Sequence, residues 1–79
     1  MSQIREHVLN ILIDVCKEEE IRSHPDIHLF DSGLLDSMGI VELLVEIEEK
    51  LSVHISITEF DRDEWSTANK IMSYVESRA

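Results

Sequence analysis

A helical stripe of apolar residues in the middle of the chain places the strongest constraint on its fold. Between Ser37 and Leu51, aliphatic residues recur three and four positions apart: Ile40, Leu43, Leu44, Ile47 and Leu51. This spacing matches the 3.6-residue period of an α-helix that buries one face. We therefore expect a helix over residues 37–51, packed through this stripe against the rest of a small core.

Both ends of the chain show the same period. The N-terminal stripe is Ile4, Val8, Ile11, Leu12 and Val15, and the C-terminal stripe is Ala68, Ile71, Met72 and Val75. Ser2 can cap the first helix, and Ser66 or Thr67 can cap the last, because a hydroxyl there accepts a bond from an unpaired helical N–H. A brief helical turn is expected near residues 58–61, where a threonine and an acid stand three apart.

Residues 21–36 show no sustained period. Pro25 and Gly33 interrupt them, yet several of their residues are apolar: Ile27, Leu29, Phe30, Leu34 and Leu35. We expect a long loop held against the core rather than a flexible linker. The sequence thus predicts a small all-α four-helix bundle, with three main helices, one short helix and a long first loop, in one domain over residues 1–79.

Acidic residues outnumber basic ones by 17 to 7, which gives a formal net charge of −10. Such a chain lacks the basic surface that nucleic acids and anionic membranes attract, so the charge argues against both as partners. The charge can serve solubility alone, or it can attract basic patches on partner proteins.

Cys16 is the only cysteine, which rules out an internal disulfide and suits a reducing compartment. We expect its thiol to pack within the bundle rather than to react. The first residues lack a basic segment followed by an apolar run, and no stretch is long enough to cross a bilayer. A cytoplasmic, monomeric protein is expected.

The predicted central helix carries a second face. Met38, Val41 and Val45 do not join the core stripe, and Glu42 and Glu48 lie on their side of the helix. One interpretation is that these apolar residues pack against a neighbouring loop. The other is a docking face, where the acids attract basic groups of a partner and the apolar residues supply contact area.

Ser37 lies between these two faces at the predicted helix start. Asp36 is a favourable N-cap, and the positive end of the helix dipole favours a phosphate on the adjacent hydroxyl. Capping alone explains Asp36, but it does not explain the second face. Ser32 also follows an aspartate, but Gly33 comes next and no helix is expected to begin there.

No catalytic residue is expected. None of the four histidines stands in a motif that marks a base for Ser37, and no Gly-x-Ser-x-Gly elbow occurs. His24 and His28 are four apart, which on a helix would let both bind one metal ion. Pro25 and the loop context disfavour a helix there, so no metal site is expected.

The run Gly-Leu-Leu-Asp-Ser-Met at residues 33–38, followed by Val-Glu-Leu at 41–43, resembles the attachment motif of acyl and peptidyl carrier proteins. That family usually has leucine where Met38 stands. The chain length, acidity and helix order resemble the same family. Residues 30–42 and 55–65 are similar to its D-alanyl carrier subgroup in Gram-positive bacteria, with Ser56 where proline is frequent.

The resemblance implies a four-helix bundle whose Ser37 is esterified with 4′-phosphopantetheine by a phosphopantetheinyl transferase that uses coenzyme A. Asp36 matches the position that caps the helix and takes part in transferase recognition. The positions that match the family's partner-facing residues are Met38, Val41, Glu42, Val45 and Glu48.

In the subgroup, a ligase uses ATP to load D-alanine on the arm as a thioester, and a membrane O-acyltransferase takes part in passing it toward teichoic acids of the cell wall. The cofactor supplies the thiol, so the protein itself needs no catalytic residue. Two alternatives stay open. One is an acyl or aminoacyl carrier of fatty acid or nonribosomal peptide synthesis, and the other is an acidic helical adaptor that is not modified.

Overall fold

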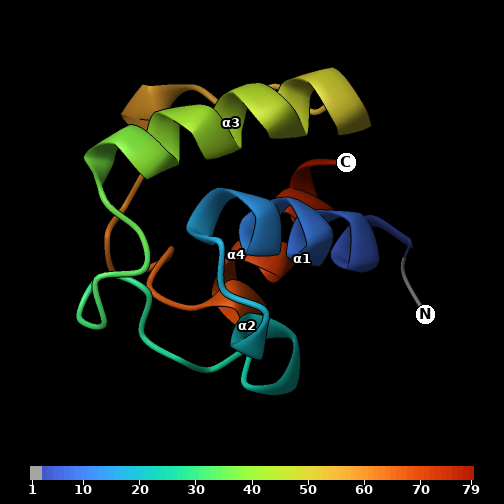
Figure 1. The fold of residues 1–79 in the computed structure, drawn as a ribbon. Coiled ribbons are helices and arrows are strands. Elements are labelled where there is room, and N and C mark those ends of the chain that lie inside the picture. Colours follow the sequence, from blue (N-terminus) through green and yellow to red (C-terminus); the bar gives the residue numbers. More distant parts are fainter. Residues whose placement is uncertain (1–2) are drawn as a thin grey trace.

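The computed structural model describes residues 3–79. Over that range its regular secondary structure consists of helices, joined by loops. Its elements are α1 (Gln3–Cys16), α2 (Glu20–Ser23), α3 (Ser37–Leu51), the 3-10 turn η1 (Ile57–Glu59) and α4 (Ala68–Arg78). Helix α1 packs against α2, α3 and α4. Figure 1 shows α3 along one side of α1 and α4, with α2 on the opposite side. The all-α class with three main helices and a short one is confirmed.

The three predicted stripes form the core. Their residues meet the two buried side chains of the long loop and the single tryptophan, and the largest fully buried side chains are Trp65, Leu12, Ile21, Leu29, Ile40, Leu43, Ile47 and Ile71. Each buried aliphatic side chain contributes roughly 1.5–3 kcal/mol relative to an exposed one. The core therefore draws on every helix, and α3 is held through one face only.

One predicted helix cap is confirmed, another lies outside the described residues, and one short helix was not expected from the sequence. Thr67 caps α4 by accepting a bond from the backbone N–H of Lys70 at 3.2 Å, as one of the two predicted caps. The predicted cap Ser2 lies outside the described residues. Residues 21–23, expected as loop, belong to α2 (Glu20–Ser23), where Ile21 is fully buried in the core.

The turn expected at residues 58–61 begins earlier. Ser56, rather than Thr58, is the N-cap of η1, and Glu59 completes a capping box by accepting a bond from the Ser56 N–H at 3.0 Å. Tyr74 donates a hydrogen bond to Glu59 at 3.2 Å, and Arg78 forms an ion pair with it. These contacts tie η1 to α4.

The loop over residues 24–36 is held against the bundle, as predicted. Leu29 is fully buried, and its N–H donates to the Ser66 carbonyl at 2.7 Å. Asn69 donates twice to the loop, from its backbone N–H to the Pro25 carbonyl at 3.1 Å and from its side chain to Asp26 at 2.7 Å. The loop is therefore anchored to the start of α4.

Candidate functional site

Ser37 is the first residue of α3, where the sequence placed it. Asp36 precedes it in an extended conformation, and Asp36 Oδ1 accepts a hydrogen bond from the Gly39 N–H at 2.8 Å. Ser37 is exposed, and no hydrogen bond engages its hydroxyl within residues 3–79. A free hydroxyl thus lies at the positive end of a 15-residue helix.

The turn before Asp36 fixes how the chain enters α3. Gly33 has φ +79°, in the left-handed region that glycine adopts without a steric penalty. The N–H groups of Leu34 and Leu35 both donate to the Leu29 carbonyl, at 3.0 and 3.1 Å, and Leu35 is buried. Ser37 is therefore held two residues from a side chain of the core.

Ser32, the rival serine, has a different environment. Its hydroxyl donates to the Leu29 carbonyl at 3.3 Å, and it lies in a turn with no helix starting after it. Its oxygen is engaged in the local turn, and no helix dipole favours an anion there. The geometry favours Ser37 over Ser32 as a site of modification.

The second face of α3 is open to solvent. Met38 is 81% exposed, Val41 53% and Val45 52%, which rules out burial of these side chains under a neighbouring loop. Glu42 and Glu48 are exposed on the same helix. Glu48 contacts Nδ1 of His54, whereas Glu42 makes no ion pair within the described residues. The face presents both apolar area and negative charge.

Ile57 extends this face and was missed by sequence reasoning. It is 53% exposed on η1 and, with Val41 and Val45, lines a shallow hollow of about 280 Å³ between α3 and the segment after it. The capping box of residues 56–59 is the signal that could have placed it, because it fixes Ile57 as the first residue of the turn.

A larger hollow of about 560 Å³ opens directly beside Ser37. Its walls are mostly apolar, with Phe30, Ile40 and Phe60 among the lining residues, and Arg62 also lines it. The Arg62 guanidinium lies over the Phe30 ring, 4.8 Å from its centroid. The hollow therefore offers space beside Ser37 and a cation among its lining residues, so a phosphate-linked group on Ser37 fits these residues.

The aromatic residues form a row that starts at this hollow. Phe30 contacts Phe60, Phe60 contacts Trp65, and Trp65 contacts Tyr74, with ring centroids 5.8, 6.0 and 5.1 Å apart. Trp65 is fully buried in the middle of the row. The wall beside Ser37 is therefore continuous with the core.

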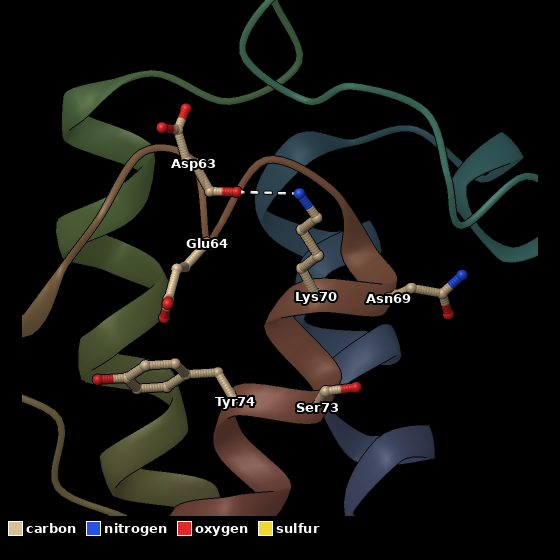
Figure 2. Close-up of a pocket in the computed structure, with 6 residues that line it drawn as sticks. All are labelled: Asp63, Glu64, Asn69, Lys70, Ser73 and Tyr74. Carbon is tan, nitrogen blue, oxygen red and sulfur yellow. Dashed lines mark hydrogen bonds between the residues drawn. The ribbon is translucent and has the colours of Figure 1, made fainter.

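Another hollow, of about 640 Å³, lies along α4 and does not include Ser37. Figure 2 shows Lys70 donating to the Asp63 carbonyl across it, at 3.2 Å. Ser73 accepts a bond from Arg5, and Tyr74 donates to Glu59. The side chains of Asn69, Lys70, Ser73 and Tyr74 are thus each engaged in a hydrogen bond.

Cys16 is half-buried and unpaired. Burial, together with the negative charge of Asp36, raises the pKa of its thiol to about 11. The thiol is therefore protonated at neutral pH and is a poor nucleophile. Cys16 also packs against the core, as expected.

Within residues 3–79, no group of three or more histidine, cysteine or acidic side chains is arranged to hold a metal ion. Over the same residues, no helix has the length and apolar character that crossing a membrane demands.

A small helical bundle with an exposed serine at the start of a capped, half-exposed helix defines a class of protein. This class is the small carrier proteins that are modified on a serine. Residues 6–75 match the family described as phosphopantetheine attachment site. The chain belongs to this family of carrier proteins, whose prosthetic group is a covalently attached 4′-phosphopantetheine.

Curated relatives sharpen the assignment. The chain is 49% identical to the D-alanyl carrier protein of Bacillus velezensis over 71 residues, which cover 90% of this chain and 91% of the relative. It is 43% identical over 76 residues to proteins of the same name from Bacillus mycoides and Bacillus cereus, with 96% of each chain covered. Both the family and the subgroup expected from the sequence are confirmed. A carrier of this family is not itself a catalyst.

Proposed function

We propose that this chain carries D-alanine on a 4′-phosphopantetheine group attached to Ser37. The observation that carries the proposal is the exposed, unbonded hydroxyl of Ser37 at the capped start of α3. The name shared by its curated relatives supports the choice of D-alanine.

Attachment is a phosphoryl-type transfer from coenzyme A. The Ser37 oxygen bonds to the phosphorus next to pantetheine, the bond from that phosphorus to the bridging oxygen breaks, and adenosine 3′,5′-bisphosphate leaves. The hydroxyl proton passes to a base of the transferase, since this chain offers no base to Ser37 within hydrogen-bonding distance in the described residues. When bound, the group supplies the thiol that holds the acyl cargo as a thioester.

The residues around Ser37 have separate roles in this proposal. Asp36 fixes the helix start and presents a carboxylate to the transferase. The docking face consists of Met38, Val41, Glu42, Val45 and Glu48. The D-alanine ligase binds it, and so does the membrane O-acyltransferase that passes D-alanine toward teichoic acids. Its mixture of exposed apolar area and negative charge suits brief contacts with basic partner surfaces.

Three further predictions accompany this function. We propose that residues 1–79 act as one unit, that the chain works as a monomer, and that loading takes place in the cytoplasm, where coenzyme A and ATP are available. The core supports the first of these, because every helix contributes to it.

Mass spectrometry tests the attachment. Incubation of the unmodified protein with coenzyme A and a broad-specificity transferase should add the mass of one phosphopantetheine. Ser37→Ala should abolish the gain, and the matched control Ser32→Ala should keep it. A gain that survives Ser37→Ala would contradict the assignment, and no gain in the native chain would favour an unmodified adaptor.

The cargo needs a separate assay. The modified protein should accept D-alanine from ATP and a D-alanine ligase but should not be loaded by fatty acyl enzymes. Efficient loading with long acyl chains would instead favour the alternative, a carrier of fatty acid or nonribosomal peptide synthesis.

A further inference from the structure

We propose that Arg62 is a positioning residue for the phosphodiester that links the prosthetic group to Ser37, and that it holds this anion at the mouth of the hollow beside α3. The inference rests on the proposed attachment at Ser37. It assigns a role to a side chain that lies outside the attachment motif and outside the docking face.

Arg62 has no acidic partner in the part of the chain that the structure describes, although the chain has 17 acidic residues. Four other basic residues form ion pairs: Arg5 with Glu76, Arg22 with Glu6, Lys50 with Glu46, and Arg78 with Glu59. Within residues 3–79, Arg62 forms neither an ion pair nor a hydrogen bond. Its guanidinium charge is thus available to an anion that the unmodified chain does not contain.

The Phe30 ring holds the guanidinium in place. The guanidinium carbon lies 4.8 Å from the ring centroid, a cation–π arrangement. A guanidinium over an aromatic face keeps N–H groups along its edge free to donate, and such donors match the oxygens of a phosphate. Phe30 is itself fixed by its edge-to-face contact with Phe60. The guanidinium therefore lies against the wall of the hollow in the unmodified chain.

Arg62 and Ser37 line the same hollow, and among the described residues that line it Arg62 is the only basic one. The only acidic one is Asp36, whose Oδ1 already accepts a bond from Gly39. A phosphate on Ser37 would stand next to this carboxylate, in a chain of net charge −10. The helix dipole offsets part of the repulsion. A guanidinium that lines the same hollow can offset more of this repulsion.

The competing explanation is that Arg62 only covers the Phe30 ring with its stem and plane. That role would be the same with and without the prosthetic group. The two explanations are separated by comparing the unmodified and the modified protein, because only the positioning role depends on the phosphate.

The experiment compares melting temperatures and NMR spectra of four proteins in both forms: the native chain, Arg62→Gln, Arg62→Lys and Arg22→Gln. The Arg22 variant is the matched control, since it removes one positive charge from α2, where Arg22 pairs with Glu6 at 3.0 Å. Mass spectrometry first confirms that each modified sample carries the group on Ser37.

Arg62→Gln should lower the melting temperature of the modified form by about 2–8 °C more than that of the unmodified form. Arg62→Lys should recover part of this difference, and Arg22→Gln should affect both forms equally. The ³¹P resonance should shift in the modified Arg62→Gln protein but not in the modified Arg22→Gln protein. The Arg62-dependent difference should also shrink in high salt.

Equal losses in both forms, together with an unchanged ³¹P resonance, would overturn the inference and leave the attachment at Ser37 intact. A native chain that gains no mass with the transferase would overturn both. These outcomes distinguish a failure of Arg62 as a positioning residue from a failure of the proposed function.

Discussion

Asp36 Oδ1 lies 2.8 Å from the backbone nitrogen of Gly39, and this hydrogen bond fixes the residue at which α3 begins. Because Ser37 is the next residue, the bond also sets the position of the hydroxyl relative to the helix axis. One aspartate side chain therefore stabilises the helix start and places a negative charge beside the serine. These two roles can be separated by mutation.

Asp36→Ala should lower the free energy of unfolding by about 1 kcal/mol, because the Gly39 N–H loses its acceptor. Urea unfolding followed by circular dichroism measures this change. Asp36→Asn is the control, since its amide oxygen can still cap the helix, so its stability should remain close to that of the native chain. Equal destabilisation by both substitutions would contradict a capping role.

The same pair tests recognition by the transferase. If the carboxylate is read as a charge, Asp36→Asn should slow modification of Ser37 although the fold is retained. The measurement is the rate of mass gain at limiting transferase. An unchanged rate for Asp36→Asn would restrict Asp36 to the helix cap.

Gly33→Ala should destabilise the protein by about 1 kcal/mol through the backbone alone. Gly33 has φ +79°, and a Cβ atom built on it would meet nothing within 4 Å, so crowding does not contribute. The unfolding midpoint in urea reports the loss. An unchanged midpoint would mean that the turn relaxes to a negative φ without cost.

Glu42→Lys should raise the KM of the ligase for this carrier by about fivefold, the factor that corresponds to about 1 kcal/mol of lost electrostatic attraction. Stability should change by less than about 0.5 kcal/mol, because Glu42 is exposed. Steady-state loading with D-alanine measures the effect.

Glu20→Lys is the matched control for this prediction, because it makes the same change of charge on α2, away from the docking face. A similar rise in KM for both variants would mean that the ligase responds to net charge rather than to the docking face.

Stability should fall as pH rises from about 9 to about 11, with Cys16 contributing to the loss. The thiol pKa is about 11 in the folded chain against an ordinary value of 9.0. Above pH 9 the unfolded chain releases this proton more readily than the folded chain, so ionisation favours unfolding. Urea midpoints across this pH range, compared with those of Cys16→Ala, isolate the contribution. A constant difference between the two proteins would contradict it.

The helices that bury apolar stripes were the predictable part of the fold. The expected bounds of the central helix match α3, and the predicted core positions Ile40, Leu43, Leu44 and Ile47 are buried. Leu51, the last residue of that stripe, is only partly buried at the helix end. A helix of three or more turns repeats its apolar residues often enough for the 3.6-residue period to be visible in one sequence. Burial of the apolar face then stabilises the helix.

Single turns were not predictable in the same way. Helix α2 has four residues and depends on burial of Ile21 in the core, which leaves no period in the sequence. The start of η1 was misassigned because Ser56 and Thr58 both offer a hydroxyl, and the side chain of Glu59 decides between them.

The position of Ser37 at the helix start, its neighbouring cap Asp36 and the exposed side of α3 could be predicted because they lie within one continuous segment. Arg62 and Phe30 could not, since they come from two different loops and meet only in the fold. The use of the docking face by partner enzymes stays a prediction, although the exposure of Met38, Val41 and Val45 is established.

The anchored loop has a consequence for delivery of the cargo. Bonds from Leu29 and to Pro25 and Asp26 fix residues 24–36 to the start of α4, and the buried Leu35 stands two residues before the serine. The segment before Ser37 is therefore not a flexible linker, and it does not add to the distance that a group on Ser37 can span. With the proposed arm on Ser37, travel between partner sites would come from rotation about single bonds within the arm and from tumbling of the whole protein. A partner that docks on α3 would thus fix the point from which the prosthetic group extends. The distance from its docking surface to its own active site would then have to match the length of that group.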